Sequence, residues 1–297
     1  MSDKFNYANP MADVQPGRIK EISSTSNPII KEIKGLALKK NRDAQKLFMA
    51  EGLKLVTDAI DMGWKIRTLV YGKQMAEQEH LAKIAQNVKA QGAYILEVTD
   101  KVLTAISRKD NPQMVIGIFE QQWHSVEELS ELASEPNDVL IALDRVRDPG
   151  NLGTIIRTGD ASGVKGLILV GETTDPYSLE AVRATMGSIF NMKIARVSNE
   201  EMIAFSDAFK GQITGTHLEG AVDYRTIDYK SAPQILFMGN EQKGLPPELT
   251  EVCSQLAFIP MAGKADSLNL AISTGIMLFE MRRDNLKMPT QRTNEQS

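Results

Sequence analysis

The chain has 297 residues, of which 42% are hydrophobic and 24% charged, and its net charge is −4. This composition is ordinary for a water-soluble globular protein of about two domains. One cysteine excludes an intrachain disulfide and a cysteine-based zinc site, and the three histidines show no ligand spacing, so we expect no metal. No apolar run approaches the roughly 18 residues of a membrane span, and no signal peptide is recognisable, so we expect a cytoplasmic protein without a membrane partner.

The first part of the chain alternates between helical and strand patterns. Residues 1–18 are polar and contain prolines, which predicts a flexible arm. A helix is expected from Pro28, with its apolar side formed by isoleucines and leucines up to Leu38. Further helices are expected over 51–62, 76–91 and 100–106, and strands over 66–71, 93–98 and 115–119. This alternation predicts a compact α/β/α domain over residues 19–120.

The start of this domain is basic although the whole chain is acidic. Residues 18–54 contain nine Lys and Arg and four Asp and Glu, a net charge of +5 (9 − 4). Lys39, Lys40 and Arg42 mark the end of the first expected helix, and Arg108 lies in a polar loop. These residues are either a solvated surface or a set of RNA-phosphate contacts.

A second domain is expected after an acidic linker. Residues 120–138 hold six acidic residues and no Lys or Arg, so residues 121–138 are predicted to separate the domains, with a helix near 126–133. Within the second domain, 139–286, short apolar strands are expected over 139–143, 166–170, 194–197, 213–216, 235–238 and 256–259. Helices are expected between them, which predicts a parallel sheet covered on both faces. Residues 287–297 are predicted to be a flexible tail.

Two loops near the carboxyl end predict a small-molecule site. The first, residues 239–244, has glycine at both ends and follows a buried strand. The second, residues 261–266, follows the next strand and leads into Ser267, a suitable N-cap for a helix over 268–282. Loops at the ends of adjacent parallel strands commonly bind ligands. No G-x-G-x-x-G follows a strand, which argues against an ordinary dinucleotide-binding enzyme.

Three motifs give a specific resemblance. NLGTIIR (151–157), GNEQKGL (239–245) with IPM (259–261), and SLNLAISTG (267–275) resemble the motifs of the SpoU (TrmH-like) group of SPOUT methyltransferases. Any one of them would be weak evidence, but three in the right order are specific. In addition, SNPIIKEIKGLALKKNR (26–42) followed by LFMAEG (47–52) resembles the small RNA-binding domain that precedes the catalytic domain in many members.

The resemblance implies a fold, a cofactor and a partner. Members carry a deep trefoil knot in the catalytic domain, work as homodimers with active sites shared across the interface, and use S-adenosylmethionine. The implied reaction transfers a methyl group to a ribose 2′-hydroxyl of RNA and requires no metal. The implied cofactor-binding residues are Gly239, Gly244, Leu245, Ile259, Met261, Ser267 and Leu268.

The implied catalytic residues are Asn151, Arg157, Glu241 and Asn269. In the family the arginine that matches Arg157 is assigned as the base that activates the hydroxyl. A guanidinium is normally protonated, so a fixed charge that holds the RNA phosphate is an equally physical role. Asn151 could instead be a helix N-cap, and Glu241 an ordinary loop carboxylate. Asn240 stands where many members have Ser or Ala.

The substrate is less specified than the reaction. The type of N-terminal domain favours large-subunit (23S-type) rRNA, by analogy. A tRNA ribose 2′-O-methyltransferase and a non-catalytic RNA-binding relative are the alternatives. Failure to bind S-adenosylmethionine would indicate the non-catalytic relative.

Overall fold

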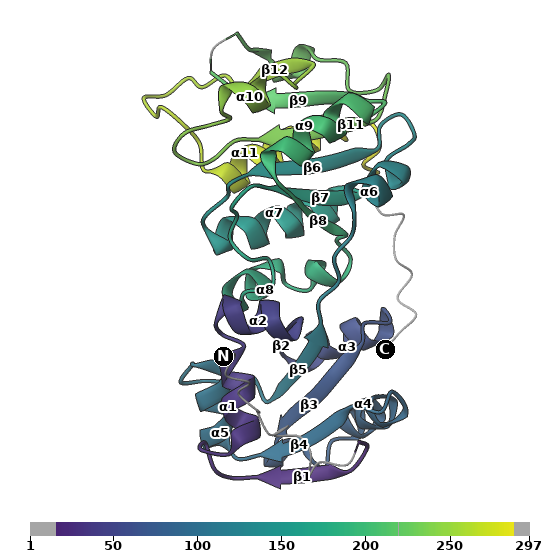
Figure 1. Ribbon diagram of the computed structural model, residues 1–297, viewed down its shortest axis with the longest axis vertical. Helices are drawn as coiled ribbons and strands as arrows, with labels where there is room; N and C mark the ends of the chain where they lie inside the picture. Colours follow the sequence, from purple (N-terminus) through teal and green to yellow (C-terminus); the bar gives the residue numbers. More distant parts are fainter. Residues whose placement is uncertain (1–15, 219, 288–297) are drawn as a thin grey trace, which may run out of the picture. The chain divides into compact units, whose positions relative to one another are not determined.

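The computed structural model describes residues 16–218 and 220–287, and it divides into two compact units (Figure 1). The first unit contains the described residues up to Gln121 together with Asp175–Phe190, and the second contains Gln122–Thr174 and the described residues from Asn191 onward. Most of the arm expected over 1–18 and of the tail expected over 287–297 lies outside the described residues.

The first unit is built on a five-stranded mixed sheet with the order β1-β4-β3-β5-β2. β5 runs antiparallel to β2 and β3, while β3, β4 and β1 are parallel. The strands are β1 (Ile19–Ile22), β2 (Leu47–Glu51), β3 (Ile66–Gly72), β4 (Tyr94–Val98) and β5 (Val115–Glu120). β1 and β2 were not expected from the sequence, because each is short and β2 runs directly into a helical pattern.

The helices of the first unit bury one face each. α1 (Pro28–Gly35) begins where the Asn27 side chain accepts a hydrogen bond from Ile29 N, and its isoleucines share a core cluster with α5 (Asp100–Ser107) and the sheet. α3 (Leu53–Asp61) packs with α4 (Glu79–Ala90). The basic run at 39–42 is not the end of α1 but the start of a separate short helix, α2 (Lys39–Gln45).

A segment from the second half of the sequence belongs to the first unit. It contains α8 (Leu179–Thr185) and a short 3-10 helix, η2 (Ser188–Phe190). Tyr177 and Phe190 join an aromatic cluster in which Phe48 and Tyr177 have ring centroids 4.6 Å apart. Trp64 Nε1 donates a hydrogen bond of 2.9 Å to Phe190 O. A helix was expected here, but as part of the second domain.

Buried ionic contacts hold the same segment. The Arg42 guanidinium lies 2.7 Å from Asp175, and both side chains are only 4% exposed. Arg42 also donates to Leu36 O at 2.7 Å, while Arg183 makes a bidentate pair with the buried Glu51 at 2.8 and 2.9 Å. The prediction that Arg42 contacts RNA is therefore wrong, because its charge is buried and neutralised inside the unit.

The second unit contains the expected parallel sheet. Its seven strands are all parallel and have the order β10-β12-β9-β11-β6-β7-β8. They are β6 (Val139–Asp144), β7 (Gly166–Val170), β8 (Ile194–Val197), β9 (Gln212–Thr216), β10 (Val222–Asp223), β11 (Gln234–Met238) and β12 (Gln255–Phe258). β6, β7 and β11 are buried along their whole length, as continuous apolar runs predict.

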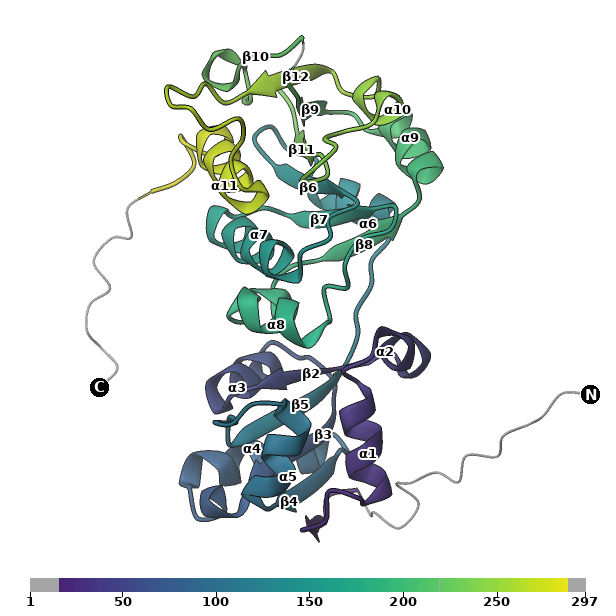
Figure 2. The same cartoon turned by 90° about the vertical axis from the view of Figure 1, so that its left-hand side faces the viewer.

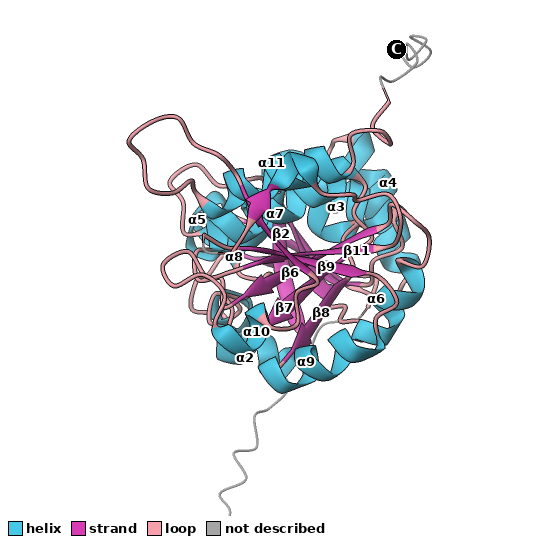
Figure 3. Ribbon diagram, turned by 90° about the horizontal axis from the view of Figure 1, so that it is seen from above, coloured by secondary structure: helices cyan, strands magenta, loops and turns pink. Residues whose placement is uncertain are grey.

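Helices cover both faces of this sheet (Figure 3). α7 (Pro149–Ser162) and α11 (Leu270–Met281) pack against each other on one face (Figure 2), while α6 (Val126–Leu132) and α9 (Asn199–Ala208) lie on the other. α10 (Pro247–Thr250) follows β11. α6 lies in the segment expected to be a linker, and it packs on β7 and β8. Among the described residues, no helix is long and apolar enough to cross a membrane.

Candidate active site

A cavity of about 640 Å³ lies at the carboxyl ends of β9, β11 and β12. Ligand sites typically have volumes of roughly 300–1,000 Å³ and occupy this position in parallel sheets. Six of the seven predicted cofactor-binding residues line it, namely Gly239, Gly244, Ile259, Met261, Ser267 and Leu268. The exception is Leu245, whose side chain is buried in the core of the second unit.

The first loop is closed by its own backbone. Asn240 N donates to Gly244 O at 3.2 Å, and Gly244 N donates to Asn240 O at 2.9 Å. Gly244 has a φ of 64°, which a side chain would strain. At Gly239 a Cβ would lie 2.3 Å from Leu245 N and 2.4 Å from Gly244 C, so only glycine allows the loop to fold back on itself.

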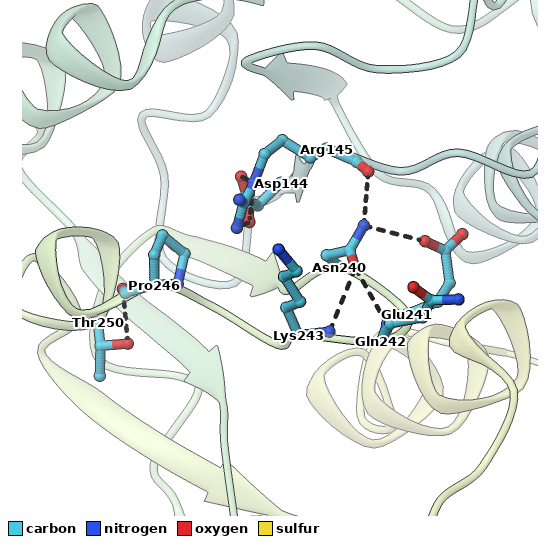
Figure 4. Close-up of polar contacts among 8 residues, drawn as sticks. All are labelled: Asp144, Arg145, Asn240, Glu241, Gln242, Lys243, Pro246 and Thr250. Carbon is cyan, nitrogen blue, oxygen red and sulfur yellow. Dashed lines mark hydrogen bonds and ion pairs between the residues drawn. The ribbon is translucent and has the colours of Figure 1, made fainter.

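Asn240 anchors this loop to the end of β6 (Figure 4). It is 7% exposed, its Nδ2 donates to Arg145 O at 2.8 Å, and its Oδ1 accepts from Gln242 N and Lys243 N. Arg145 makes a bidentate contact with the buried Asp144, since its Nε donates to Oδ1 at 2.8 Å and its Nη2 donates to Oδ2 at 2.7 Å, and this hydrogen bonding raises the pKa of Arg145. Ala at position 240 has no side-chain group that could make these contacts.

Three of the predicted catalytic residues lie together. Asn269 Nδ2 donates to Asn151 Oδ1 at 2.9 Å, and Asn151 Nδ2 donates to Glu241 Oε1 at 3.4 Å. Asn269 is also the N-cap of α11, since its Oδ1 accepts from Ala271 N and Ile272 N. This position belongs to Asn269, so the prediction of Ser267 as the N-cap is wrong.

The caps explain how these side chains are held. α7 is capped by Asp148, which accepts from Asn151 N at 2.6 Å, so Asn151 is not the N-cap and its amide is free to bridge. The result is a chain of polar groups from α11 through α7 to the loop after β11, with Glu241 also lining the cavity.

The fourth predicted catalytic residue lies apart from the other three. The Arg157 side chain is exposed on α7, makes no hydrogen bond or ion pair with another described residue, and does not line the cavity. Lys39, Lys40 and Arg108 are exposed in the first unit, as an RNA-binding role requires.

Part of the cavity wall was not expected from the sequence. Thr216, His217 and Leu218 line the cavity after β9. The strand expected over 213–216 could have indicated them, because the residues that follow parallel strands lie together at one edge of the sheet. Another cavity of the second unit, of about 730 Å³, is bounded by α6, β8 and α9 and contains none of the motif residues. We therefore assign the chemistry to the smaller cavity.

The residues of the smaller cavity suit a nucleoside cofactor such as S-adenosylmethionine. Apolar side chains including Met238, Ile259 and Leu270 provide a surface for a flat base, and the loop backbone supplies N–H and C=O groups. Because residue 239 is glycine, the backbone of the loop packs closely there and no side chain at this position projects into the cavity. Among the described residues no cluster of His, Cys, Asp or Glu could hold a metal ion.

Replacing Gly239 by alanine should weaken binding of S-adenosylmethionine by about ten- to a hundredfold, because the methyl group meets backbone that must move. Gly263→Ala is the matched control, since no atom lies within 4 Å of the added Cβ and the residue lies in the second loop. Isothermal titration of both variants measures the difference. Equal affinities would show that the loop does not contact the cofactor.

Comparisons with known proteins support the family resemblance that the sequence motifs give. Residues 138–279 match the model of the SpoU rRNA Methylase family, and residues 27–117 match the MRM3-like substrate binding domain. A 23S rRNA (uridine(2479)-2′-O)-methyltransferase from Streptomyces viridochromogenes is 29% identical over 252 residues, which are 83% of this chain and 86% of the relative. A 23S rRNA (guanosine(2553)-2′-O)-methyltransferase from Bacillus subtilis is 28% identical over 89% of this chain and all of its own length (100%).

A solved structure is more similar. An rRNA methyltransferase from Sinorhizobium meliloti is 56% identical, with a TM-score of 0.85, and the match covers 91% of this chain and 99% of the other. A second structure, of an rRNA methyltransferase from Sinorhizobium meliloti with bound AdoMet (S-adenosylmethionine), is 57% identical over the same shares of both chains. The likeness therefore extends over both units and includes a relative that binds the expected cofactor.

Proposed function

The chain belongs to the SpoU family of RNA methyltransferases, and we propose that its substrate is a ribose 2′-hydroxyl of large-subunit (23S-type) rRNA. The protein is an RNA 2′-O-ribose methyltransferase that depends on S-adenosylmethionine. The observation that carries the substrate proposal is similarity along both units to relatives that methylate 23S rRNA. The first unit matters here because it matches a substrate-binding domain.

We assign the residues of the second unit three tasks. The cavity holds the cofactor, which supplies an activated methyl group on its sulfonium. The bridge from Asn269 through Asn151 to Glu241 holds the motif loops in one arrangement, so that the hydroxyl and the methyl group can be aligned. Arg157 then either assists loss of the hydroxyl proton or holds the neighbouring phosphate; both tasks need its exposed position.

We propose that the active enzyme is a homodimer. α11 exposes Ile272 and Phe279, which are 55% and 48% accessible and lie seven residues apart on one helix. An exposed apolar stripe on a helix that packs against α7 would be covered by a second copy. The dimer would bring Arg157 of one protomer toward the cavity of its partner, which accounts for the separation of Arg157 from the cavity.

Two further properties follow from the family and remain proposals. The first is a trefoil knot: α11 follows β12 near one edge of the sheet and returns to pack on α7, which is compatible with a threaded chain. A crystal structure whose backbone contains no knot would refute it. The second is a cytoplasmic location, where RNA substrates are found; a fluorescent fusion observed elsewhere would refute it.

In the first unit, Lys39, Lys40 and Arg108 are proposed to contact RNA phosphates. Each phosphate contact that is removed should reduce the salt dependence of RNA binding by about one unit of log–log slope. If replacing all three residues by glutamine left the salt dependence of RNA binding unchanged, this surface would not be a site of RNA-phosphate contacts.

The substrate proposal is tested by mapping ribose methylation. A strain that lacks the gene should lose one 2′-O-methyl group from large-subunit rRNA, and the purified protein with S-adenosylmethionine should restore it on unmodified rRNA. Loss confined to tRNA would favour the alternative substrate. A protein that binds RNA but transfers no methyl group to either would be a non-catalytic relative.

A further inference from the structure

A separate cavity of about 390 Å³ lies within the first unit. Its walls come from α1, the end of α2, and the strands β2, β3 and β5. The residues that line it include Glu32, Lys46, Arg67 and Thr68. None of the predicted RNA-binding residues does, so this cavity has no role in the function described so far.

Glu32 is the unusual group of this cavity. Its Oε2 atom is buried and has no hydrogen-bond partner among the described residues. Burial raises the pKa of Glu32, and the nearby positive charge of Arg67 opposes this only in part. A buried carboxylate oxygen without a donor is costly, and native proteins rarely keep one without a reason. An N–H donor brought by a ligand would satisfy it.

Lys46 and Arg67 are the cations that line the cavity, and the carboxylate of Glu120, which also lines it, is paired with Lys65 at 2.9 Å. Arg67 lies where the pairing of β3 with β5 shifts register between Ile66 and Thr68, an irregularity that redirects a side chain. Its guanidinium is exposed and lies 5.5 Å from the centre of the Tyr94 ring. Lys46 is exposed as well and has a left-handed backbone with a φ of 56°, just after α2. Cations at the rim and an acceptor inside suit a ligand with phosphates outside and N–H groups at its tip.

We propose that this cavity receives one unpaired base of the RNA substrate, with its N–H edge on Glu32 and its flanking phosphates on Lys46 and Arg67. The inference rests on the proposed function, since it requires an RNA substrate. Proteins read RNA mainly through splayed bases that are held by their hydrogen-bonding edges. Guanine fits best, because its N1–H and N2–H groups are adjacent donors for one carboxylate. Uracil fits worse, because its single N–H lies between two carbonyls that would repel the carboxylate.

The decisive variant is Glu32→Gln, with Glu79→Gln as its control. Glu79 is 84% exposed on α4 and forms only a surface pair with Lys83, so its replacement makes the same charge change away from the cavity. Glu32→Gln should raise KM for rRNA by about 10- to 100-fold, the range of a charge-assisted hydrogen bond, with kcat and cofactor affinity unchanged. It should also raise Tm, because a carboxylate whose Oε2 atom is buried without a donor loses its charge. Weaker RNA binding together with higher stability would identify a group kept for a ligand.

A direct probe uses the four nucleoside 5′-monophosphates. Titrated into the full-length protein at millimolar concentration, guanosine monophosphate should shift amide resonances around Glu32 and Thr68 more than the other three, and Glu32→Gln should abolish the shifts. The proposal would be overturned if Glu32→Gln methylated rRNA with the wild-type KM, or if no nucleotide shifted the amide resonances of the wild-type protein. A wild-type protein that methylates no rRNA would instead reject the proposed substrate, so the two failures are distinguishable.

Discussion

Arg157→Ala should lower methyl transfer to rRNA by about 10²- to 10⁴-fold while leaving affinity for S-adenosylmethionine unchanged. The side chain is exposed, has no partner among the described residues and does not line the cavity, so its loss disturbs neither the fold nor the cofactor loops. A group that stabilises transferring charge or holds the substrate phosphate acts only once RNA is bound. Single-turnover methylation and cofactor titration measure the two quantities separately.

Two further variants serve as controls for Arg157→Ala. Thr154→Ala changes another exposed residue of α7 and should remain active. Arg157→Lys keeps the charge and loses the planar fork, so partial activity would favour a phosphate anchor over a role that needs the guanidinium itself. Full activity of Arg157→Ala would refute both roles.

The same variant tests the proposed sharing of sites across a dimer. When S-adenosylmethionine is limiting, Arg157→Ala and Gly239→Ala should each be nearly inactive alone. If one site combines Arg157 of one protomer with the cavity of its partner, a mixed dimer has one site with both defects and one intact site. Random co-assembly should then restore about a quarter of the wild-type activity. Activity no greater than the sum of the two separate variants would contradict a shared site.

Asp175→Asn should destabilise the first unit by about 3–5 kcal/mol, because it leaves the Arg42 guanidinium buried without its counter-charge. Asparagine keeps the shape and the acceptor for Tyr177 N, so the loss reports the charge pair. Denaturant unfolding followed by Trp64 fluorescence, in a Trp123→Phe background, measures the unit that contains the pair. Trp64 reports this unit because it contacts Phe190 of the same segment.

An exposed pair provides the comparison. Asp58→Asn breaks the surface contact with Lys54 and should cost at most about 1 kcal/mol. The double variant Arg42→Met with Asp175→Leu should recover only part of the stability lost in Asp175→Asn, since apolar residues can replace a buried ion pair but not the side-chain contacts to Leu36 O and Tyr177 N. If Asp175→Asn were no more harmful than Asp58→Asn, the segment 175–190 would not depend on this pair.

Much of the fold could be predicted from local pattern. Continuous apolar runs such as residues 166–170 predicted buried parallel strands, and the structure contains them in one parallel sheet. The errors arose where two signals compete over few residues. β2 is a short buried strand followed at once by helical sequence, and Ser267 and Asn269 are both good N-caps two residues apart. Propensity alone cannot choose between such neighbours, because their energies differ by little.

The sequence by itself determined the chemistry: three motifs at the right spacing identified the cofactor, the reaction and most of the cavity wall. Only the tertiary structure decided which side chains meet. It joined Asn151 with Glu241 and Asn269, placed 175–190 in the first unit, and turned Arg42 from an expected RNA contact into a buried partner of Asp175. The reason is physical. Sequence patterns report interactions within a few residues, whereas Arg42 and Asp175 are 133 residues apart, and whether a charge is buried depends on what the fold packs around it.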